Sequence, residues 1–207
     1  RIESYELSEY MILDGSTRRN LELVETLREK GKYGSLLWAI DKTKTNMGAR
    51  LLRSWICQPL KKVDNILKRQ NAITEFVEKS EKRHELISIL EKIYDIQRLS
   101  TRLSNNSANP KDFLSLKSSL YKLPELLEAS KDLEFNPFKN IVEYKDEIAD
   151  YTELIDKTIK DDAPITIKEG GVIKEGVSGE LDYYKDLLDN GEKWLRDFEE
   201  RERNLTG

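Results

Sequence analysis

The residues of this chain that could do chemistry begin with a glycine-rich segment, Gly171-Val172-Ile173-Lys174-Glu175-Gly176-Val177-Ser178. Its glycine spacing and its final serine match a phosphate-binding loop, whose backbone N–H groups cradle phosphates. Such a loop needs a lysine directly before the serine, where this chain has Val177, and no strong buried strand precedes the segment. We therefore predict a glycine-rich turn in front of a helix and no nucleotide site.

Nucleophilic and metal chemistry is limited by the single histidine, His84, and the single cysteine, Cys57. A catalytic triad or a Cys-His pair would have to use His84, which stands in a charged stretch and is expected at the surface. Cys57 lies in an apolar helical pattern, so a buried structural thiol is expected. A zinc site needs several Cys or His ligands, and acidic pairs such as Asp161-Asp162 are usually solvated. We predict no catalytic residue, no metal ligand and no cofactor site.

The charge of the chain is unevenly distributed. The net charge is −4, so the overall electrostatic footprint of a dedicated nucleic-acid-binding domain is missing. Residues 42–69 are nevertheless basic, with Asp64 as the one opposing carboxylate, whereas residues 180–202 are mostly acidic. Basic residues on helices usually form solvated faces, and the one aromatic residue among them, Trp55, is expected to be buried. We predict no direct DNA contact from this segment.

Composition favours an all-α fold for the elements that must position these residues. The 207 residues are 36% charged and 38% hydrophobic, with few glycines and prolines. A single cysteine excludes an intramolecular disulfide and indicates a reducing, cytoplasmic compartment. No apolar run is long enough to span a bilayer, and residues 1–10 have no signal-peptide pattern. Because the chain does not begin with methionine and stops in charged sequence, we expect a fragment of a longer polypeptide.

The apolar spacing predicts a multi-helix bundle. Ser35 is expected to cap a short helix over 36–40, and Thr45 a helix that buries an aromatic stripe and ends before Pro59. Asp64 is expected to cap the next helix, with a charged break over 80–83 behind it. Residues 21–27 allow either a strand or a helix. Further elements are a helix that starts at Pro110, a short turn at Pro124, a helix of about six turns over 141–159, and an extended or hairpin-like segment over 164–174.

An ordered series of motifs resembles the core, or lever, region of the MutS family of DNA mismatch-repair ATPases. The series begins with residues 13–23, continues with residues 41–60, and is extended by 69–73, 95–98, 109–113, 170–176 and 200–203. The resemblance covers nearly the whole chain. The structural residues that it implies are Asp14, Thr17, Arg18, Arg19, Asn20, Met47, Gly48, Arg50, Trp55, Pro59, Gly170 and Gly171.

The resemblance implies a MutS-like helical core over residues 1–178 and a lever helix over residues 179–207 that leads to a DNA clamp beyond the chain. The family's mismatch-reading Phe-x-Glu motif, its nucleotide-binding loop and its dimerising ATPase domain are not found in these residues. We therefore expect a fragment that is not an enzyme. Arg18-Arg19 is expected to fix a backbone turn or to pair with carboxylates across a domain junction.

The leading hypothesis is a structural segment that links the ATPase domain to the clamp and supports mismatched-DNA binding by the full-length protein. The resemblance implies ATP and magnesium, a homodimer, mismatched double-stranded DNA and downstream mismatch-repair proteins as cofactors and partners of the full-length protein, with no membrane. The alternative is an independent helical scaffold that binds proteins and not DNA. The lever hypothesis expects residues 182–203 to form one unbroken helix, packed through Leu188, Trp194, Leu195 and Phe198.

Overall fold

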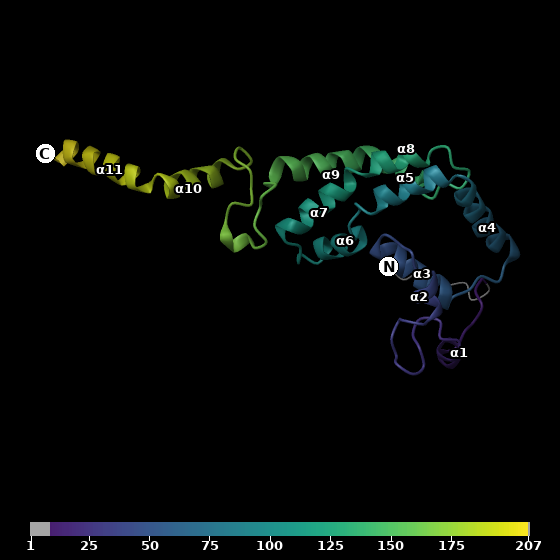
Figure 1. Ribbon diagram of the computed structural model, residues 1–207. Coiled ribbons are helices and arrows are strands. Elements are labelled where there is room, and N and C mark those ends of the chain that lie inside the picture. Colours follow the sequence, from purple (N-terminus) through teal and green to yellow (C-terminus); the bar gives the residue numbers. More distant parts are fainter. Residues whose placement is uncertain (1–8, 207) are drawn as a thin grey trace.

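The computed structural model describes residues 9–206, which form a helical bundle with a smaller lobe at one side and a helical arm at the other (Figure 1). The all-α prediction is confirmed, because the described residues contain no strand and only isolated antiparallel bridges, such as Tyr10 with Leu60. Residues 1–8 and Gly207 belong to the predicted units 1–178 and 179–207 but lie outside the described residues. The division of the chain at residue 178 stays a prediction.

The small lobe contains α1 (Gly15–Asn20), α2 (Leu36–Ile40) and α3 (Asn46–Cys57). The predicted caps of α2 and α3 are confirmed, because Ser35 and Thr45 accept hydrogen bonds from the backbone three residues later. Residues 21–27, for which strand and helix were both predicted as possible, instead belong to a series of turns over 21–35. Leu23 anchors these turns, since its side chain is buried and its carbonyl accepts from the backbone of Leu37.

Helices α4 (Val63–Glu78) and α5 (Ser80–Leu90) are separated by a single residue, Lys79. The predicted break over 80–83 is therefore wrong, because these charged residues form helix readily and start α5. Asp64 is not the cap of α4 either. It lies in the first turn, where its charge still complements the helix dipole, while the N-cap Lys62 makes no side-chain capping bond.

The bundle is completed by α6 (Ile96–Ser104), α7 (Pro110–Leu120), α8 (Leu123–Ser130), a 3₁₀ helix η1 (Lys139–Tyr144) and α9 (Lys145–Thr158). Pro110 starts α7 as predicted, behind a capping box in which Asn109 and Asp112 each accept from the other's backbone. The predicted six-turn helix over 141–159 is wrong in its first part, which is 3₁₀, and the turn predicted at Pro124 is a full α-helix.

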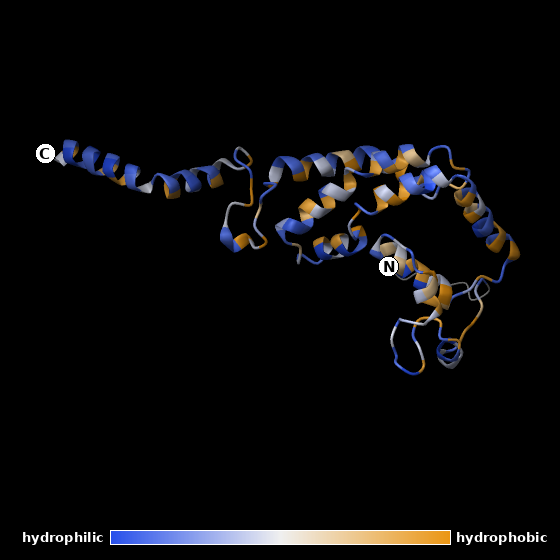
Figure 2. Ribbon diagram, viewed as in Figure 1, coloured by the Kyte–Doolittle hydropathy of each residue, from blue (hydrophilic) through white to orange (hydrophobic). Residues whose placement is uncertain are grey.

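The main core lies between α5 and α8, which lie side by side and both carry hydrophobic residues in Figure 2. It is a cluster of side chains that are each less than 10% exposed: Leu86, Ile89, Ile93, Leu123, Leu126, Ala129 and Leu133. A second buried cluster, made of Ile155, Ile159 and Ala163, packs α9 and the turn behind it against α7. Burial of these faces is the main stabilising contribution, since each fully buried Leu or Ile side chain is worth about 1.5–3 kcal/mol.

The segment over 164–174 was predicted to be extended or hairpin-like, and this is correct only at its end. Residues 167–169 form a 3₁₀ turn, η2 (Ile167–Glu169), and Gly170 and Gly171 follow with positive φ angles of 73° and 68°. Ile173 then pairs with Ile159, at the end of α9, rather than with a residue of the same segment. The glycines allow the left-handed backbone that this reversal needs.

The arm consists of α10 (Gly179–Asp189) and α11 (Gly191–Thr206). The prediction of one unbroken helix over 182–203 is wrong, because the helix is interrupted at Asn190. Asn190 and Gly191 are poor helix formers, and Asn190 leaves helical geometry at φ −111° and ψ 16°. Among residues 9–206, the predicted packing of Leu188, Trp194, Leu195 and Phe198 against another helix is also absent, since these side chains are 46–84% exposed.

The break at Asn190 yields a first prediction. We expect Gly191→Ala to extend helical structure through the joint, because alanine is favoured over glycine in a helix by about 1 kcal/mol and the added Cβ meets no atom within 4 Å. Circular dichroism at 222 nm should show increased helicity, and amide exchange of residues 188–194 should slow.

The matched control is Gly31→Ala, which adds a methyl group in open space within a turn and should leave helicity unchanged. Equal helicity in Gly191→Ala and the parent chain would show that the joint is not caused by the weak helix propensity of these residues.

Candidate functional site

The first group of residues implied by the resemblance forms α1 and its cap. Asp14 accepts a hydrogen bond from the backbone N of Thr17 at 2.6 Å, and this bond is the main reason why the pKa of Asp14 is lowered. Arg18, Arg19 and Asn20 are exposed. The Arg18 side chain reaches the Asp14 carbonyl at 3.5 Å, within its own helix. Asp14 thus fixes the start of a short helix whose basic side is solvated.

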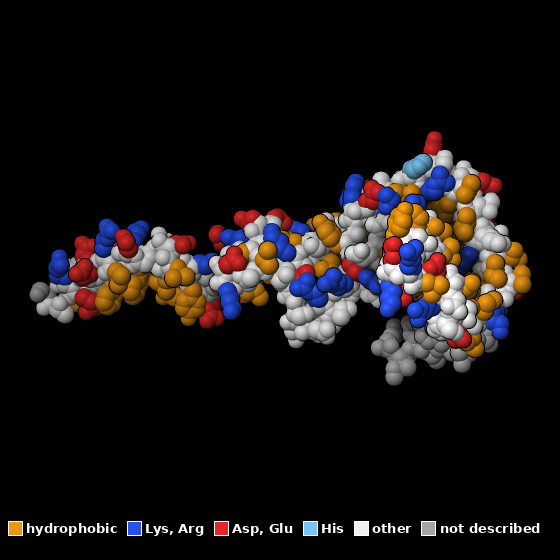
Figure 3. Space-filling model, turned by 60° about the horizontal axis from the view of Figure 1, so that its bottom comes forward, with side chains coloured by type: hydrophobic (Ala, Val, Ile, Leu, Met, Phe, Trp, Pro, Cys, Tyr) orange, Lys and Arg blue, Asp and Glu red, His pale blue; other side chains and the backbone are white. Residues whose placement is uncertain are grey.

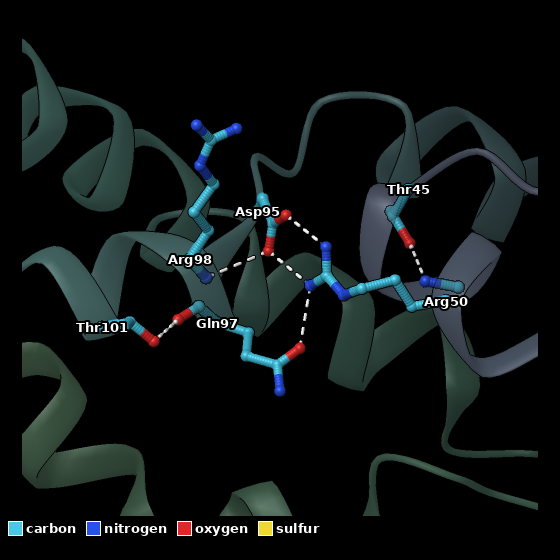
Figure 4. Close-up of polar contacts among 7 residues, drawn as sticks. Thr45, Arg50, Asp95, Gln97, Arg98 and Thr101 are labelled. Atoms are coloured by element: carbon cyan, nitrogen blue, oxygen red, sulfur yellow. Dashed lines mark hydrogen bonds and ion pairs between the residues drawn. The ribbon is translucent and has the colours of Figure 1, made fainter. Parts of the chain in front are cut away.

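The second group meets the bundle through Arg50 of α3 (Figure 4). The guanidinium donates to both carboxylate oxygens of Asp95, at 2.7 and 2.8 Å, and to Oε1 of Gln97 at 2.8 Å. Asp95 is also the N-cap of α6, accepting from the backbone N of Arg98 at 3.1 Å. One carboxylate therefore starts α6 and holds α3. The two-pronged geometry is one that Arg provides and Lys cannot.

Two further contacts from α3 and its N-terminal loop accompany this ion pair. Met47 packs against the main core cluster, and Lys44 lies 2.6 Å from Glu91, just beyond α5. The sequence-predicted residues Met47 and Arg50 are thus brought to the same corner of the fold. Gly48 lies in the first turn of the same helix. A larger residue would be crowded there, because a Cβ at this position would lie only 3.1 Å from the Thr45 hydroxyl that caps α3.

Trp55 of α3 defines a second corner. Trp55 was predicted to be buried, and this is wrong: its side chain is 41% exposed. The Arg69 guanidinium of α4 stacks over the indole ring at 3.7 Å from the centroid, a cation–π contact that holds α3 beside α4. None of the residues of α3 is fully buried, Cys57 included, because the lobe is too small to cover both sides of its helices. Pro59 lies next to this corner, and its carbonyl accepts from the backbone of Met11.

Glu75 of α4 defines a third corner, which sequence reasoning missed. Its carboxylate accepts from the backbone N of Glu134 at 2.8 Å and of Phe135 at 2.9 Å, and from Lys79 at 2.8 Å. Glu134 and Phe135 lie 59 and 60 residues further along the chain, so no local pattern could identify these two partners. Asp95, by contrast, could have been selected from the sequence as a structural residue, because it belongs to one of the motifs on which the resemblance rests.

These three corners join α3 to α4, α3 to the start of α6 just beyond α5, and α4 to the loop behind α8. Helices α3, α4 and α5 form the sides of a triangle in Figure 1. Each corner is held by a side chain that is at least partly exposed, so the triangle depends on polar geometry more than on burial. We call this arrangement, with its corners at Arg50–Asp95, Trp55–Arg69 and Glu75–Phe135, the helical triangle. It contains no nucleophile next to a base, and it is suited to fixing the direction of helices.

The other residues considered for chemistry lie apart from the triangle. Ser178 accepts from the backbone N of Leu181 and caps α10, as predicted for a glycine-rich turn before a helix. His84 is exposed on α5, in agreement with the sequence prediction. Asp161 is not simply solvated, since it lies 2.6 Å from Lys117.

Among residues 9–206, no group of three or more His, Cys, Asp or Glu side chains is placed to hold a metal ion. Within that range no helix is long and apolar enough to cross a membrane.

The fold and the helical triangle define an all-α structural domain. Comparison with protein families identifies which one: the model for MutS domain III matches residues 16–205, so the chain belongs to the MutS domain III family. Relatives named DNA mismatch repair protein MutS are 45% identical over 205 residues in Acetivibrio thermocellus, covering 98% of this chain, and 46% identical over 206 residues in Lachnoclostridium phytofermentans, covering all of it. The relative from Listeria monocytogenes EGD-e is 39% identical over 203 residues, covering 98% of the chain. The chain spans 22–24% of the length of these relatives.

The Arg50–Asp95 contact yields a second prediction. Arg50→Lys and Asp95→Asn should each lower the urea midpoint of unfolding, because each removes the two-pronged pair, while asparagine retains a capping oxygen for α6. The double variant should lose less than the sum of the two single losses, since both remove the same interaction. Arg53→Lys, an exposed change on the same helix, serves as the control with little effect. Strictly additive losses would contradict the contact.

The acidic corners yield a third prediction. Arg50 holds the pKa of Asp95 at about 2, and Lys79 holds that of Glu75 at about 2. Both values lie below the unfolded range of about 4, so the stabilisation is fully present above that range and is lost as the pH falls toward about 2. We expect the free energy of unfolding to decrease from about pH 4 downward, and less steeply in Asp95→Asn. Urea unfolding at several pH values measures this, and equal slopes in variant and parent would refute it.

Proposed function

We propose that this chain is a non-catalytic structural segment of a DNA mismatch-repair ATPase, which links the ATPase domain to the DNA clamp and supports mismatched-DNA binding by the full-length protein. The observation that carries the proposal is the match to MutS domain III over residues 16–205, together with relatives of which the chain spans less than a quarter. Most of such a protein lies outside this chain, so a connecting role suits a helical domain without an assembled catalytic group.

The geometry supports a mechanical role. Helices keep their length because their backbone hydrogen bonds are internal, so a displacement at one end is carried to the other as a rigid-body motion. The helical triangle would keep the small lobe fixed to the bundle, and the arm would carry displacement away from it. Because the arm is interrupted at Asn190, we propose two rods with a joint between them, in place of a single rigid lever.

The surface of the arm supports a partner helix. Figure 3 shows hydrophobic side chains gathered along one side of the arm and charged side chains over the rest. The apolar residues include Tyr184, Leu188, Leu195 and Phe198, which are 46–84% exposed in this chain. In the full-length protein we propose that a second helix covers them, since an apolar stripe of this kind is characteristic of helix pairs.

The remaining expectations are part of the same proposal. We propose that ATP and magnesium act in the full-length protein outside these residues, and that this chain holds no cofactor and catalyses no reaction. Mismatched double-stranded DNA, a second copy of the full-length protein and downstream mismatch-repair proteins are the proposed partners. The proposed compartment is the cytoplasm, consistent with the unpaired Cys57.

Two assays on the 207-residue chain test the proposal and form a fourth prediction. Titration with a labelled mismatched duplex at low and moderate salt should give weak or undetectable binding that weakens steeply with salt, because the basic residues of 42–69 are partly neutralised by Glu91, Asp95 and Glu9. ATP hydrolysis should not exceed the background. A fully paired duplex of the same length is the control. Tight, mismatch-selective binding or ATP turnover by the chain would overturn the proposal.

A further inference from the structure

The arm is attached to the bundle through a short returning segment, residues 172–174. After α9 ends, the chain turns back and this segment runs antiparallel to the end of the helix. The backbone N of Lys160 donates to the carbonyl of Val172, and the backbone N of Lys174 donates to the carbonyl of Thr158, both at 2.9 Å. The position of the returning segment relative to α9 is therefore fixed by a small backbone ladder.

The start of α10 is tied to the returning segment by side chains. Lys185 donates to the carbonyl of Ile173 at 2.9 Å, and the backbone N of Gly176 donates to the carboxylate of Asp182 at 2.8 Å. Ser178 caps the helix between them. Because α10 is held to residues 173–176 from two points, its direction follows the direction of the returning segment.

Lys117 of α7 lies under this attachment. Its ammonium is 3.0 Å from the carboxylate of Asp156, in the last turns of α9, and 2.6 Å from that of Asp161, in the turn that follows. The Lys117 side chain is only 12% exposed, whereas its two partners are 45% and 74% exposed. Asp156 also faces Lys174 of the returning segment, at 3.9 Å. The four charges form a chain from α7 through α9 to the base of the arm.

The Lys117 network differs from the ion pair that lies within α9. Lys157 and Glu153 are also an ion pair, but they lie one turn apart on α9 and are both mostly exposed, so their contact fixes nothing beyond that turn. The contacts of Lys117 join residues 39 and 44 positions apart. Loss of this mostly buried cation would remove the shared partner of two carboxylates that both lie within 3.0 Å of it, and the two negative charges would then repel each other.

We propose that Lys117 is a positioning residue that sets the direction in which the arm leaves the bundle. It draws the end of α9 and the turn after it onto α7, and through Asp156 it orders Lys174 and the returning segment to which α10 is tied. The apolar contacts of Ile155, Ile159 and Val172 hold the same elements together but allow small rotations, whereas an ammonium that contacts two carboxylates on successive parts of the chain restricts how far these parts can move apart. The inference rests on the proposed function only for its biological meaning, because the direction of the arm can be measured without DNA or ATP.

The test measures the distance between spin labels on Lys111→Cys, in α7, and Asp189→Cys, at the end of α10, in a Cys57→Ser background that removes the one native cysteine. Both labelled positions are exposed, and both lie before the joint at Asn190. In Lys117→Met, which keeps the apolar stem and removes the charge, we expect the distance distribution to shift and broaden. In Lys117→Arg, which keeps the charge, and in the control Lys157→Met, it should match that of the parent.

An unchanged distribution in a folded Lys117→Met variant would overturn the inference. If circular dichroism shows that this variant does not fold, Asp161→Asn provides the test, because it removes one exposed carboxylate of the network and should broaden the distribution to a smaller extent. Matching distributions in Asp161→Asn and the parent would then count against the inference. These outcomes are independent of the DNA and ATP assays above, so failure here and failure of the proposed function are distinguished.

Discussion

The direction of α3 relative to the bundle depends on one long-range constraint, the two-pronged ion pair between Arg50 and Asp95, which are 45 residues apart in the chain. Without it, α3 would be joined to the bundle through Met47, the Lys44–Glu91 pair and the covalent path along α4. The pair is partly exposed, so it cannot replace the hydrophobic core as a source of stability. Its contribution is geometric, because a planar guanidinium that meets a carboxylate edge-on defines an orientation as well as a distance.

The same principle recurs at two further junctions between helices. Glu75 orders the loop behind α8 by accepting two backbone hydrogen bonds, and Lys117 joins α7 to the end of α9. In each case a side chain of one helix contacts groups in or near the segment that follows another helix, where backbone donors or charges lack partners within a helix of their own. A domain built from short helices has many such ends. Polar contacts at those ends therefore determine how the helices are directed, while the apolar clusters determine that they associate.

The apolar surface that remains exposed agrees with a domain that belongs to a larger protein. The arm and α4 both keep apolar side chains in solvent, among them Leu67, Val77 and Leu188. A monomeric domain rarely exposes long apolar stripes of this kind. Since the chain spans less than a quarter of its MutS relatives, the rest of such a protein is available to cover them. The break at Asn190 divides the arm into two helices.

The sequence by itself determined the helical class, the caps at Ser35 and Thr45, the helix start at Pro110, and the family, because caps and apolar periodicity are local properties and the motif series can be read in order. It misplaced the break between α4 and α5, predicted one helix where Asn190-Gly191 divides two, and placed Trp55 in the core. Only the tertiary structure decided that Trp55 lies under Arg69 and that Arg50, Glu75 and Lys117 find partners 39 to 60 residues away. Such partners are brought together by the packing of whole helices, and no window of local sequence contains both members of the pair.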